Sequence, residues 1–124
     1  MTKTIQLISP VDGRVYAERP CADTGQLYRA LAAAADTQAQ WKRRPLNERA
    51  GICSAAVDAM LAMKDDIVPE LAWQMGRPVR FGAGELRGFE ERARHMIAIA
   101  PEALAAVEPG PVAGFKRYIK REPL

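Results

Sequence analysis

The sequence is poor in the residues from which active sites are most often built. Its 124 residues include one histidine and two cysteines, and aromatic residues make up only 6%. A zinc site needs three or four protein ligands, so His95, with Glu91 one helical turn before it, does not suffice. Cys21 and Cys53 have a spacing that sets neither a disulfide framework nor a zinc motif. We expect two reduced thiols in a cytoplasmic protein.

Long hydrophobic runs and a dominant charge are also missing. No stretch of about 18 apolar residues occurs, which excludes a membrane-spanning helix, and residues 1–6 lack the basic and apolar regions of a signal peptide. The net charge is only +3. A nucleic-acid-binding protein normally collects its basic residues on one stripe, whereas here they concentrate only in residues 116–121. We therefore expect neither a membrane nor a nucleic acid among the partners.

The composition that remains is that of a globular chain, with 48% hydrophobic and 27% charged residues. Its start predicts a β-hairpin. Residues 5–7 alternate between apolar and polar side chains, the period of a half-buried strand, and Ile8 breaks the alternation. Residues 10–13, Pro-Val-Asp-Gly, have the chemistry of a turn. Residues 14–17 resume as a strand, which Pro20 ends.

Three long helices follow in the prediction, each with apolar residues three and four positions apart. Asp23 or Thr24 can cap the first helix, and Gln26 three residues after Asp23 permits a capping box. Alanines give this segment high helix propensity. Basic residues 42–44 are expected in its last turn, where the helix dipole favours them, and Pro45 stops the helix.

The second predicted helix starts near Leu46 and is interrupted at residues 65–66. A further helical piece then carries Pro69 in its first turn, the place where proline is tolerated, and ends at Gly76. Residues 77–84 contain three helix breakers and are expected to form a loop.

The third predicted helix covers residues 86–100 and has the most regular apolar pattern of the three. Glu90 and Arg94 form a favourable pair one turn apart on its solvent face, and Pro101 should kink or restart the helix. After a second loop, residues 115–121 are predicted to form a strand with no obvious partner in the chain. Pro123 and Leu124 follow that strand.

Two segments superficially suggest chemistry. Cys53 is a possible nucleophile, but it lies in the apolar stripe of the second helix, where burial disfavours the reactive thiolate. We therefore interpret it as a packing residue, and Cys21 has a weaker case.

Residues 82–84, Gly-Ala-Gly, precede a helix as anion-binding loops do. No buried strand runs into them, so we interpret them as a plain loop and cap.

The aromatic residues are better explained by packing than by stacking on nucleotide bases. Trp41, Trp73 and Phe89 fall in predicted helices and should act as core anchors. Phe115 and Tyr118 lie in a basic strand, but a base-stacking RNA-binding sheet has four strands.

Taken in order, these segments resemble the N-terminal region of the aldehyde dehydrogenase superfamily along nearly the whole chain. The order and spacing of the segments carry the resemblance, because no single motif is highly specific. The family's stretch Glu-Leu-Ala followed by Met-Gly-Lys-Pro is matched here by ELAWQMGRP, in which Arg77 replaces the commoner lysine. The similar segments are a hairpin SPVDGRVYAERP, a helix ADTGQLYRALAAAADTQAQW that ends in tryptophan, a helix that opens on Glu48-Arg49, the stretch ELAWQMGRP, the helix GELRGFEERARHMIAIAPEAL and the strand RYIKREPL.

The resemblance implies an α/β parent fold, of which this chain supplies a mostly α part: a β-hairpin, three long helices and one C-terminal strand. Residues 1–114 would form the hairpin and helical layer of the cofactor-binding domain. Residues 115–124 would start the strand that enters the family's oligomerisation sheet. The residues implied in oligomerisation are Phe115, Arg117, Tyr118, Ile119 and Arg121.

The parent activity implied by the resemblance is oxidation of an aldehyde to a carboxylic acid with NAD or NADP. It proceeds by thiolate attack, hydride transfer to nicotinamide and hydrolysis of a thioester. In the family, the cofactor loop, the glutamate base, the cysteine nucleophile and the oxyanion-hole asparagine lie further along and have no counterpart here. We therefore assign no catalytic, cofactor-binding or metal residue, and expect a scaffold that binds no cofactor and is inactive alone.

Three hypotheses follow. In the first, the chain is a dehydrogenase fragment whose partner is the remainder of that fold or a homologous subunit, with self-association through exposed apolar stripes. In the second, it is a helical interaction module that binds or regulates a dehydrogenase-like subunit. In the third, the basic strand at residues 115–121 binds nucleic acid in a salt-sensitive way.

Overall fold

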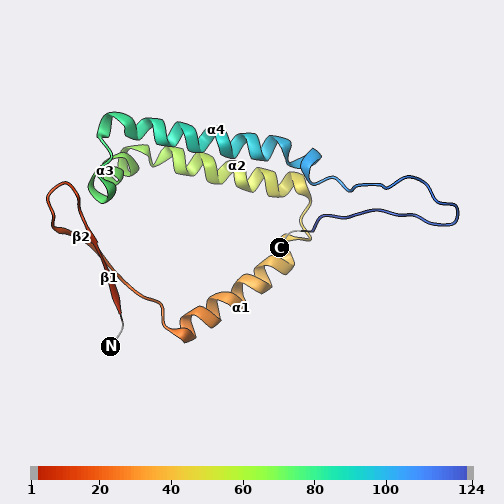
Figure 1. Ribbon diagram of the computed structural model, residues 1–124, viewed down its shortest axis with the longest axis horizontal. Coiled ribbons are helices and arrows are strands. Elements are labelled where there is room, and N and C mark those ends of the chain that lie inside the picture. The colour runs from red at the N-terminus through yellow and green to blue at the C-terminus, as the bar shows by residue number, and fades with distance from the viewer. Residues whose placement is uncertain (1–2, 123–124) are drawn as a thin grey trace.

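The structure is a computed structural model that describes residues 3–122. In Figure 1, α2 and α4 lie side by side and run in opposite directions, with α3 at one end of the pair and the hairpin beyond α3. Helix α1 stands apart from this group. Within residues 3–122, none of the helices combines the length and the hydropathy that a bilayer-spanning segment requires. The elements are β1 (Thr4–Ile8), β2 (Val15–Pro20), α1 (Thr24–Trp41), α2 (Leu46–Ala62), α3 (Lys64–Met75) and α4 (Val79–Ala103).

The hairpin is confirmed in type and position. Strands β1 and β2 pair antiparallel, and their register shifts between Leu7 and Ile8, the point at which the sequence alternation fails. The turn is closed by a backbone bond of 2.9 Å from the N–H of Gly13 to the carbonyl of Ser9. Gly13 has a φ of 74°, a conformation that glycine adopts without steric cost.

The start of α1 is confirmed in detail. The Asp23 carboxylate accepts the backbone N–H of Gln26 at 2.7 Å, and the Gln26 side chain accepts the N–H of Asp23 at 2.8 Å. This is the predicted capping box. The helix ends at Trp41 and Lys42 caps it, so basic residues 42–44 follow the last turn and the prediction that they lie within it was wrong.

The break between α2 and α3 falls at Met63, two residues before the expected interruption at residues 65–66. Asp65 and Asp66 lie in the first turn of α3 instead, where the positive end of the helix dipole stabilises carboxylates. Pro69 consequently lies in the second turn of α3 and not in the first. The helix ends as predicted at Gly76, in the left-handed conformation with φ 72°.

The predicted loop at residues 77–84 was wrong, because α4 begins at Val79 and contains Gly82 and Gly84. Gly82 is buried against Val68 of α3, and a Cβ atom at Gly82 would lie 2.6 Å from Val68 Cγ1. The glycine therefore permits a close approach of α3 and α4. Pro101 does not restart the helix, since α4 continues to Ala103.

The core of the helical group is small. Among the residues that the structure describes, the buried hydrophobic side chains are Val57 of α2 and Leu86 of α4, 4% and 6% exposed. The Arg94 guanidinium of α4 contacts Glu90 at 2.9 Å, as predicted, and also Asp58 of α2 at 2.6 Å. The pair expected on the solvent face therefore also joins two helices.

The aromatic residues that we predicted to be core anchors are not in this core. Trp73 and Phe89 are exposed, and Trp41 is only half-buried. The prediction was wrong because helical spacing locates an apolar face but does not show whether another element covers it.

Replacing Gly82 with alanine should destabilise the chain by about 1–3 kcal/mol, because the added methyl group overpacks the contact with Val68. Gly84→Ala is the matched control, since a Cβ atom there meets no atom within 4 Å. In this control, better helix propensity should stabilise the protein by up to about 1 kcal/mol. Urea unfolding of both variants tests this, and equal stability of the two would contradict the proposed contact. Adding Val68→Ala should relieve part of the Gly82→Ala penalty.

Candidate functional site

The structure does not gather the candidate catalytic residues into a site. Glu91 and His95 are both exposed on α4, and no group of three potential metal ligands occurs between residues 3 and 122. Cys21 and Cys53 are free thiols. Cys53 is exposed, so our prediction that it is buried in the α2 stripe was wrong: its side chain lies on a part of α2 that α3 and α4 leave open.

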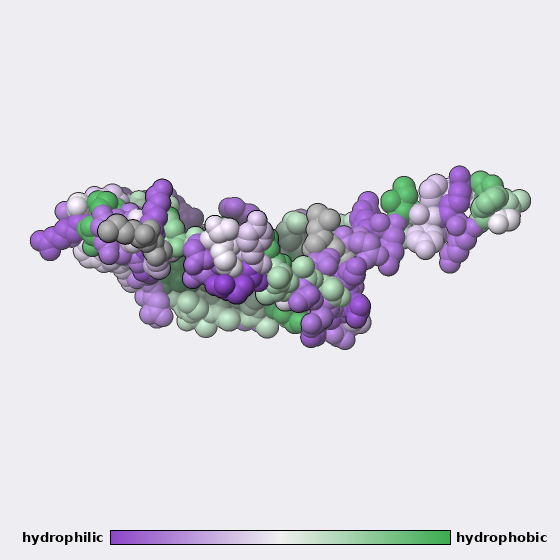
Figure 2. All heavy atoms as spheres, turned by 90° about the horizontal axis from the view of Figure 1, so that it is seen from below, coloured by the Kyte–Doolittle hydropathy of each residue, from purple (hydrophilic) through white to green (hydrophobic). Residues whose placement is uncertain are grey.

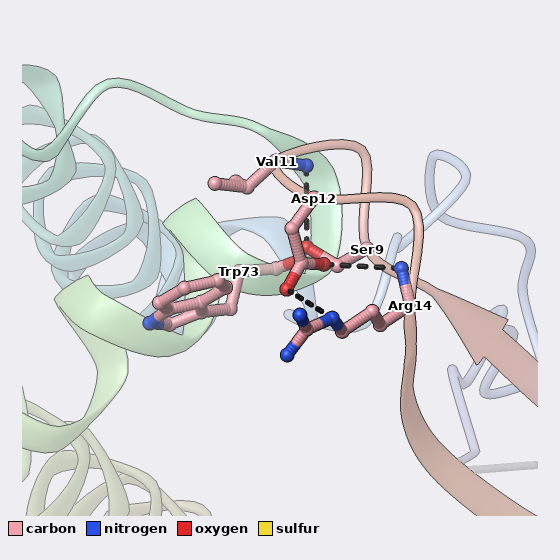
Figure 3. Close-up of polar contacts among 5 residues, drawn as sticks. All are labelled: Ser9, Val11, Asp12, Arg14 and Trp73. Atoms are coloured by element: carbon pink, nitrogen blue, oxygen red, sulfur yellow. Dashed lines mark hydrogen bonds and ion pairs between the residues drawn. The ribbon is translucent and has the colours of Figure 1, made fainter.

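Polar contacts join the hairpin to the end of α3. Ser9 is 1% exposed, and its hydroxyl donates a hydrogen bond of 2.6 Å to the backbone carbonyl of Trp73. The same hydroxyl accepts the backbone N–H of Val11 at 3.2 Å. Figure 3 shows Ser9 between the turn, where Asp12 binds Arg14, and the helix that carries Trp73. One buried hydroxyl thus satisfies polar groups of two elements.

Tyr16 of β2 makes the second contact with α3. Its ring stacks on the Trp73 indole, with the ring centroids 6.1 Å apart and the planes 5° from parallel. Its hydroxyl donates to Glu70 Oε1 at 2.7 Å. The hydrogen bond from Tyr16, followed by one from Gln74, lowers the pKa of Glu70 below its ordinary value. Sequence reasoning missed this junction because its members lie more than fifty positions apart.

The C-terminal segment folds back on itself as a two-stranded ribbon, which we call the arm and define as residues 107–121. Val107 and Ile119 exchange backbone hydrogen bonds of 3.0 and 2.8 Å, and Val112 pairs with Phe115. In Figure 1 the arm projects away from the helices beyond the end of α4. The prediction that residues 115–121 have no partner in the chain was therefore wrong, and they form isolated bridges instead of a regular strand.

The five side chains predicted to act in oligomerisation all lie on the arm and divide into two groups. Arg117 donates to the carbonyl of Gly110 at 2.6 Å, within the arm, and Arg121 donates to that of Ala105 at 2.6 Å, which joins the base of the arm to the segment just after α4. The other three, Phe115, Tyr118 and Ile119, are 72%, 57% and 59% exposed.

Apolar residues also show on the surface of the arm in Figure 2, including at its far tip. The arm therefore presents apolar side chains to solvent on a narrow ribbon whose backbone can pair with further strands. This arrangement suits association with another polypeptide. The predicted boundary between residues 114 and 115, and the oligomeric role of these side chains, stay predictions.

A second unpartnered surface lies on α1. This helix packs along none of the other helices, and it leaves large side chains exposed. Leu27, Tyr28 and Leu31 are examples, with Leu31 65% exposed. An 18-residue helix with an apolar stripe normally lies against another element, so α1 is the second candidate interaction surface.

Comparison with known proteins accounts for these features together. The model of the aldehyde dehydrogenase family matches residues 1–124. The chain therefore belongs to the aldehyde dehydrogenase family, and its hairpin and four helices have the fold of the N-terminal part of these enzymes. The three long helices are α1, α2 and α4, and α3 is the further helical piece that was predicted to end at Gly76.

Curated relatives match the chain along most of its length. It is 29% identical to a 3,6-anhydro-alpha-L-galactose dehydrogenase of Streptomyces coelicolor over 124 residues, which is 98% of this chain and 24% of that protein. It is 25% identical to a mitochondrial succinate-semialdehyde dehydrogenase of Arabidopsis thaliana over 84 residues, 68% of this chain and 16% of the relative. The chain thus spans about a quarter or less of these relatives.

Solved structures show the same fold. PnpE in complex with nicotinamide adenine dinucleotide superposes with a TM-score of 0.85 at 22% identity, covering 96% of this chain and 24% of PnpE. An NAD-dependent benzaldehyde dehydrogenase of Corynebacterium glutamicum has a TM-score of 0.79 at 23% identity, covering 90% of this chain and 24% of the other. Over the matched residues, the chain therefore has the fold of these longer proteins.

The hairpin–α3 junction predicts a pH effect at Glu70. Because its pKa is lowered in the folded chain, the carboxylate contributes stability that is present above its unfolded pKa and lost as the pH falls through the folded value. Tyr16→Phe removes the hydrogen bond from the Tyr16 hydroxyl, which is the largest cause of the lowered pKa, so the Glu70 pKa should rise toward its ordinary value. Carboxyl NMR titration measures this. Tyr28→Phe, on α1, is the control and should leave Glu70 unchanged; an unchanged Glu70 pKa in Tyr16→Phe would contradict the contact.

Proposed function

We propose that this chain acts as the N-terminal part of an NAD(P)-dependent aldehyde dehydrogenase, whose parent activity is oxidation of an aldehyde to a carboxylic acid. Alone it is inactive and binds no cofactor. The observation that supports this proposal is the extent of the two matches. The family model matches the whole chain, whereas the chain spans only 24% of the Streptomyces coelicolor relative. The parent enzyme works in the cytoplasm, where thiols such as Cys21 and Cys53 stay reduced.

The partner in this proposal is the remainder of the dehydrogenase fold or a homologous subunit. Two surfaces support it, the stripe of α1 and the apolar side chains of the arm. Each Å² of apolar surface removed from water contributes about 25 cal/mol, so packing these surfaces on a second polypeptide is favourable. The NAD in the PnpE structure supports NAD or NADP as the cofactor of the completed enzyme.

The purified chain should show no aldehyde-dependent reduction of NAD or NADP with benzaldehyde or succinate semialdehyde, because no nucleophile is paired with a bound nicotinamide. A chimera that joins residues 1–124 to the remaining three-quarters or so of the Streptomyces coelicolor relative should restore NAD(P)H formation, followed by absorbance. Activity of the chain by itself, free of full-length enzyme, would overturn the proposal. A stable complex of the chain with the intact relative, together with an inactive chimera, would favour the interaction-module hypothesis instead.

Without its partner, the chain should self-associate through the arm. Replacing Phe115, Tyr118 and Ile119 with serine removes the apolar side chains but leaves Arg117 and its bond to Gly110. We expect sedimentation velocity to show association of the native chain that falls in this variant. Val79→Ser removes a similarly exposed side chain from α4 and should have no effect. A monomeric native chain at all concentrations would contradict the prediction.

A further inference from the structure

An open groove runs along the side of α3. Its volume of about 310 Å³ is at the lower limit for a small-molecule site and is enough for a few side chains of a polypeptide. Residues four positions apart lie on one side of a helix, so the lining forms two rows. The polar row consists of Asp66, Glu70 and Gln74. The apolar row consists of Met63, Ile67, Leu71 and Met75. We call these seven residues the α3 groove.

The apolar row of the α3 groove is open to contact. Met63 and Met75 are exposed, and Ile67 and Leu71 are half-buried. Apolar side chains that gather on a surface are typical of a protein contact. The methionine side chains, which adapt their shape to what they touch, suit a surface that receives apolar side chains.

The charge of α3 limits which kind of partner suits the groove. The helix contains one lysine against Asp65, Asp66 and Glu70, so it is acidic. Asp66 forms no ion pair within residues 3–122. Glu70 accepts hydrogen bonds from Tyr16 and Gln74, which lower its pKa and favour the charged form. A segment that is both apolar and basic therefore complements the two rows together.

The arm of the same protein is a segment of this kind. It presents three exposed apolar side chains, and residues 107–121 contain four basic residues against one acidic residue. Lys116 forms no ion pair in the described part of the chain, and Arg117 and Arg121 bind neutral carbonyl groups. Two arms placed together would bring like charges side by side, whereas an arm on α3 would bring opposite charges together.

The arm is unable to reach the α3 groove of its own chain. It lies beyond the end of α4, whereas α3 lies at the start of α4 (Figure 1). Helix α4 has 25 residues, so it is roughly 38 Å long at about 1.5 Å per residue. Each side of the arm has about seven residues, which extend only about 23 Å as a strand. The groove that the arm can occupy therefore belongs to another molecule.

We propose that the arm of one copy of this chain docks into the α3 groove of a second copy. The inference deepens the proposed function and rests on it in one respect, the self-association through the arm, for which it names the receiving surface. Every copy has one arm and one groove, so the contact joins two different surfaces. Such contacts close into a pair when they are reciprocal and extend into longer chains when they are not.

Mixing two defective variants tests the contact. The groove variant carries Met63→Ser, Asp66→Lys and Met75→Ser, which change exposed side chains and leave Ile67 and Leu71 in place. The arm variant carries serine at positions 115, 118 and 119. In sedimentation velocity, each variant alone should associate about tenfold or more weakly than the native chain. Together they should form a one-to-one complex, because one supplies an intact arm and the other an intact groove.

Two outcomes of this experiment overturn the inference. A groove variant that associates as the native chain does shows that arms meet arms or another surface. Two monomeric variants that stay monomeric when mixed show that the arm and the groove do not meet. Glu91→Lys, on the exposed surface of α4, is the matched control for the reversed charge and should associate as the native chain does.

A charge exchange tests the same contact with single substitutions of exposed residues. Asp66→Lys and Lys116→Glu should each weaken association by about fivefold or more, and the two changes in one chain should recover most of the loss. Losses that simply add overturn the inference.

Activity of the chimera described above tests the proposed function separately. An active chimera without rescue by the charge exchange removes the docking site alone, whereas rescue with an inactive chimera removes the proposed function alone. The rest of the Streptomyces coelicolor relative, added in trans, checks the other occupant. If it binds the native chain and not the groove variant, while the groove variant self-associates normally, the groove belongs to that polypeptide and the inference is wrong.

Discussion

Apolar surface governs the behaviour of this chain, because its helices carry more of it than the chain can cover. Within residues 3–122, the apolar side chains that become buried are Val57 of α2 and Leu86 of α4. Burial of apolar area is the main favourable term in folding, so the chain gains little folding free energy from it. The exposed stripe of α1 and the arm follow from the same deficit, and both are surfaces that the proposed partner polypeptide would cover.

Polar contacts compensate at particular places. The Ser9 hydroxyl joins the hairpin to the carbonyl of Trp73, and Arg94 joins α2 to α4 through Asp58. The exposed Arg94 pairs contribute little stability each, since solvent screens them. Together, the Ser9 and Arg94 contacts link the hairpin to α3 and α2 to α4, in a fold shared with a benzaldehyde dehydrogenase more than three times as long.

Sequence reasoning succeeded where a local rule decides the structure. The capping box of α1 needs only residues 23–26, and the turn at residues 10–13 only its own proline and glycine. It failed where a distant element decides. Three breakers at residues 77–84 predicted a loop, but Val68 of α3 supplies the surface against which Gly82 packs inside α4. The prediction that Cys53 is buried was wrong for the same reason. An apolar stripe shows which side of a helix is apolar, but not whether another element covers that side.

The sequence by itself therefore determined the hairpin, the start of α1, the regular stripe of α4 and, through the order of its segments, the resemblance to aldehyde dehydrogenases. These depend on contacts a few residues apart. Only the tertiary structure decided that Tyr16 lies on Trp73, that Ser9 binds the Trp73 carbonyl and that Val107 pairs with Ile119 in the arm. Such contacts join residues far apart in the chain, and packing, which propensity does not encode, selects among the conformations that each segment allows.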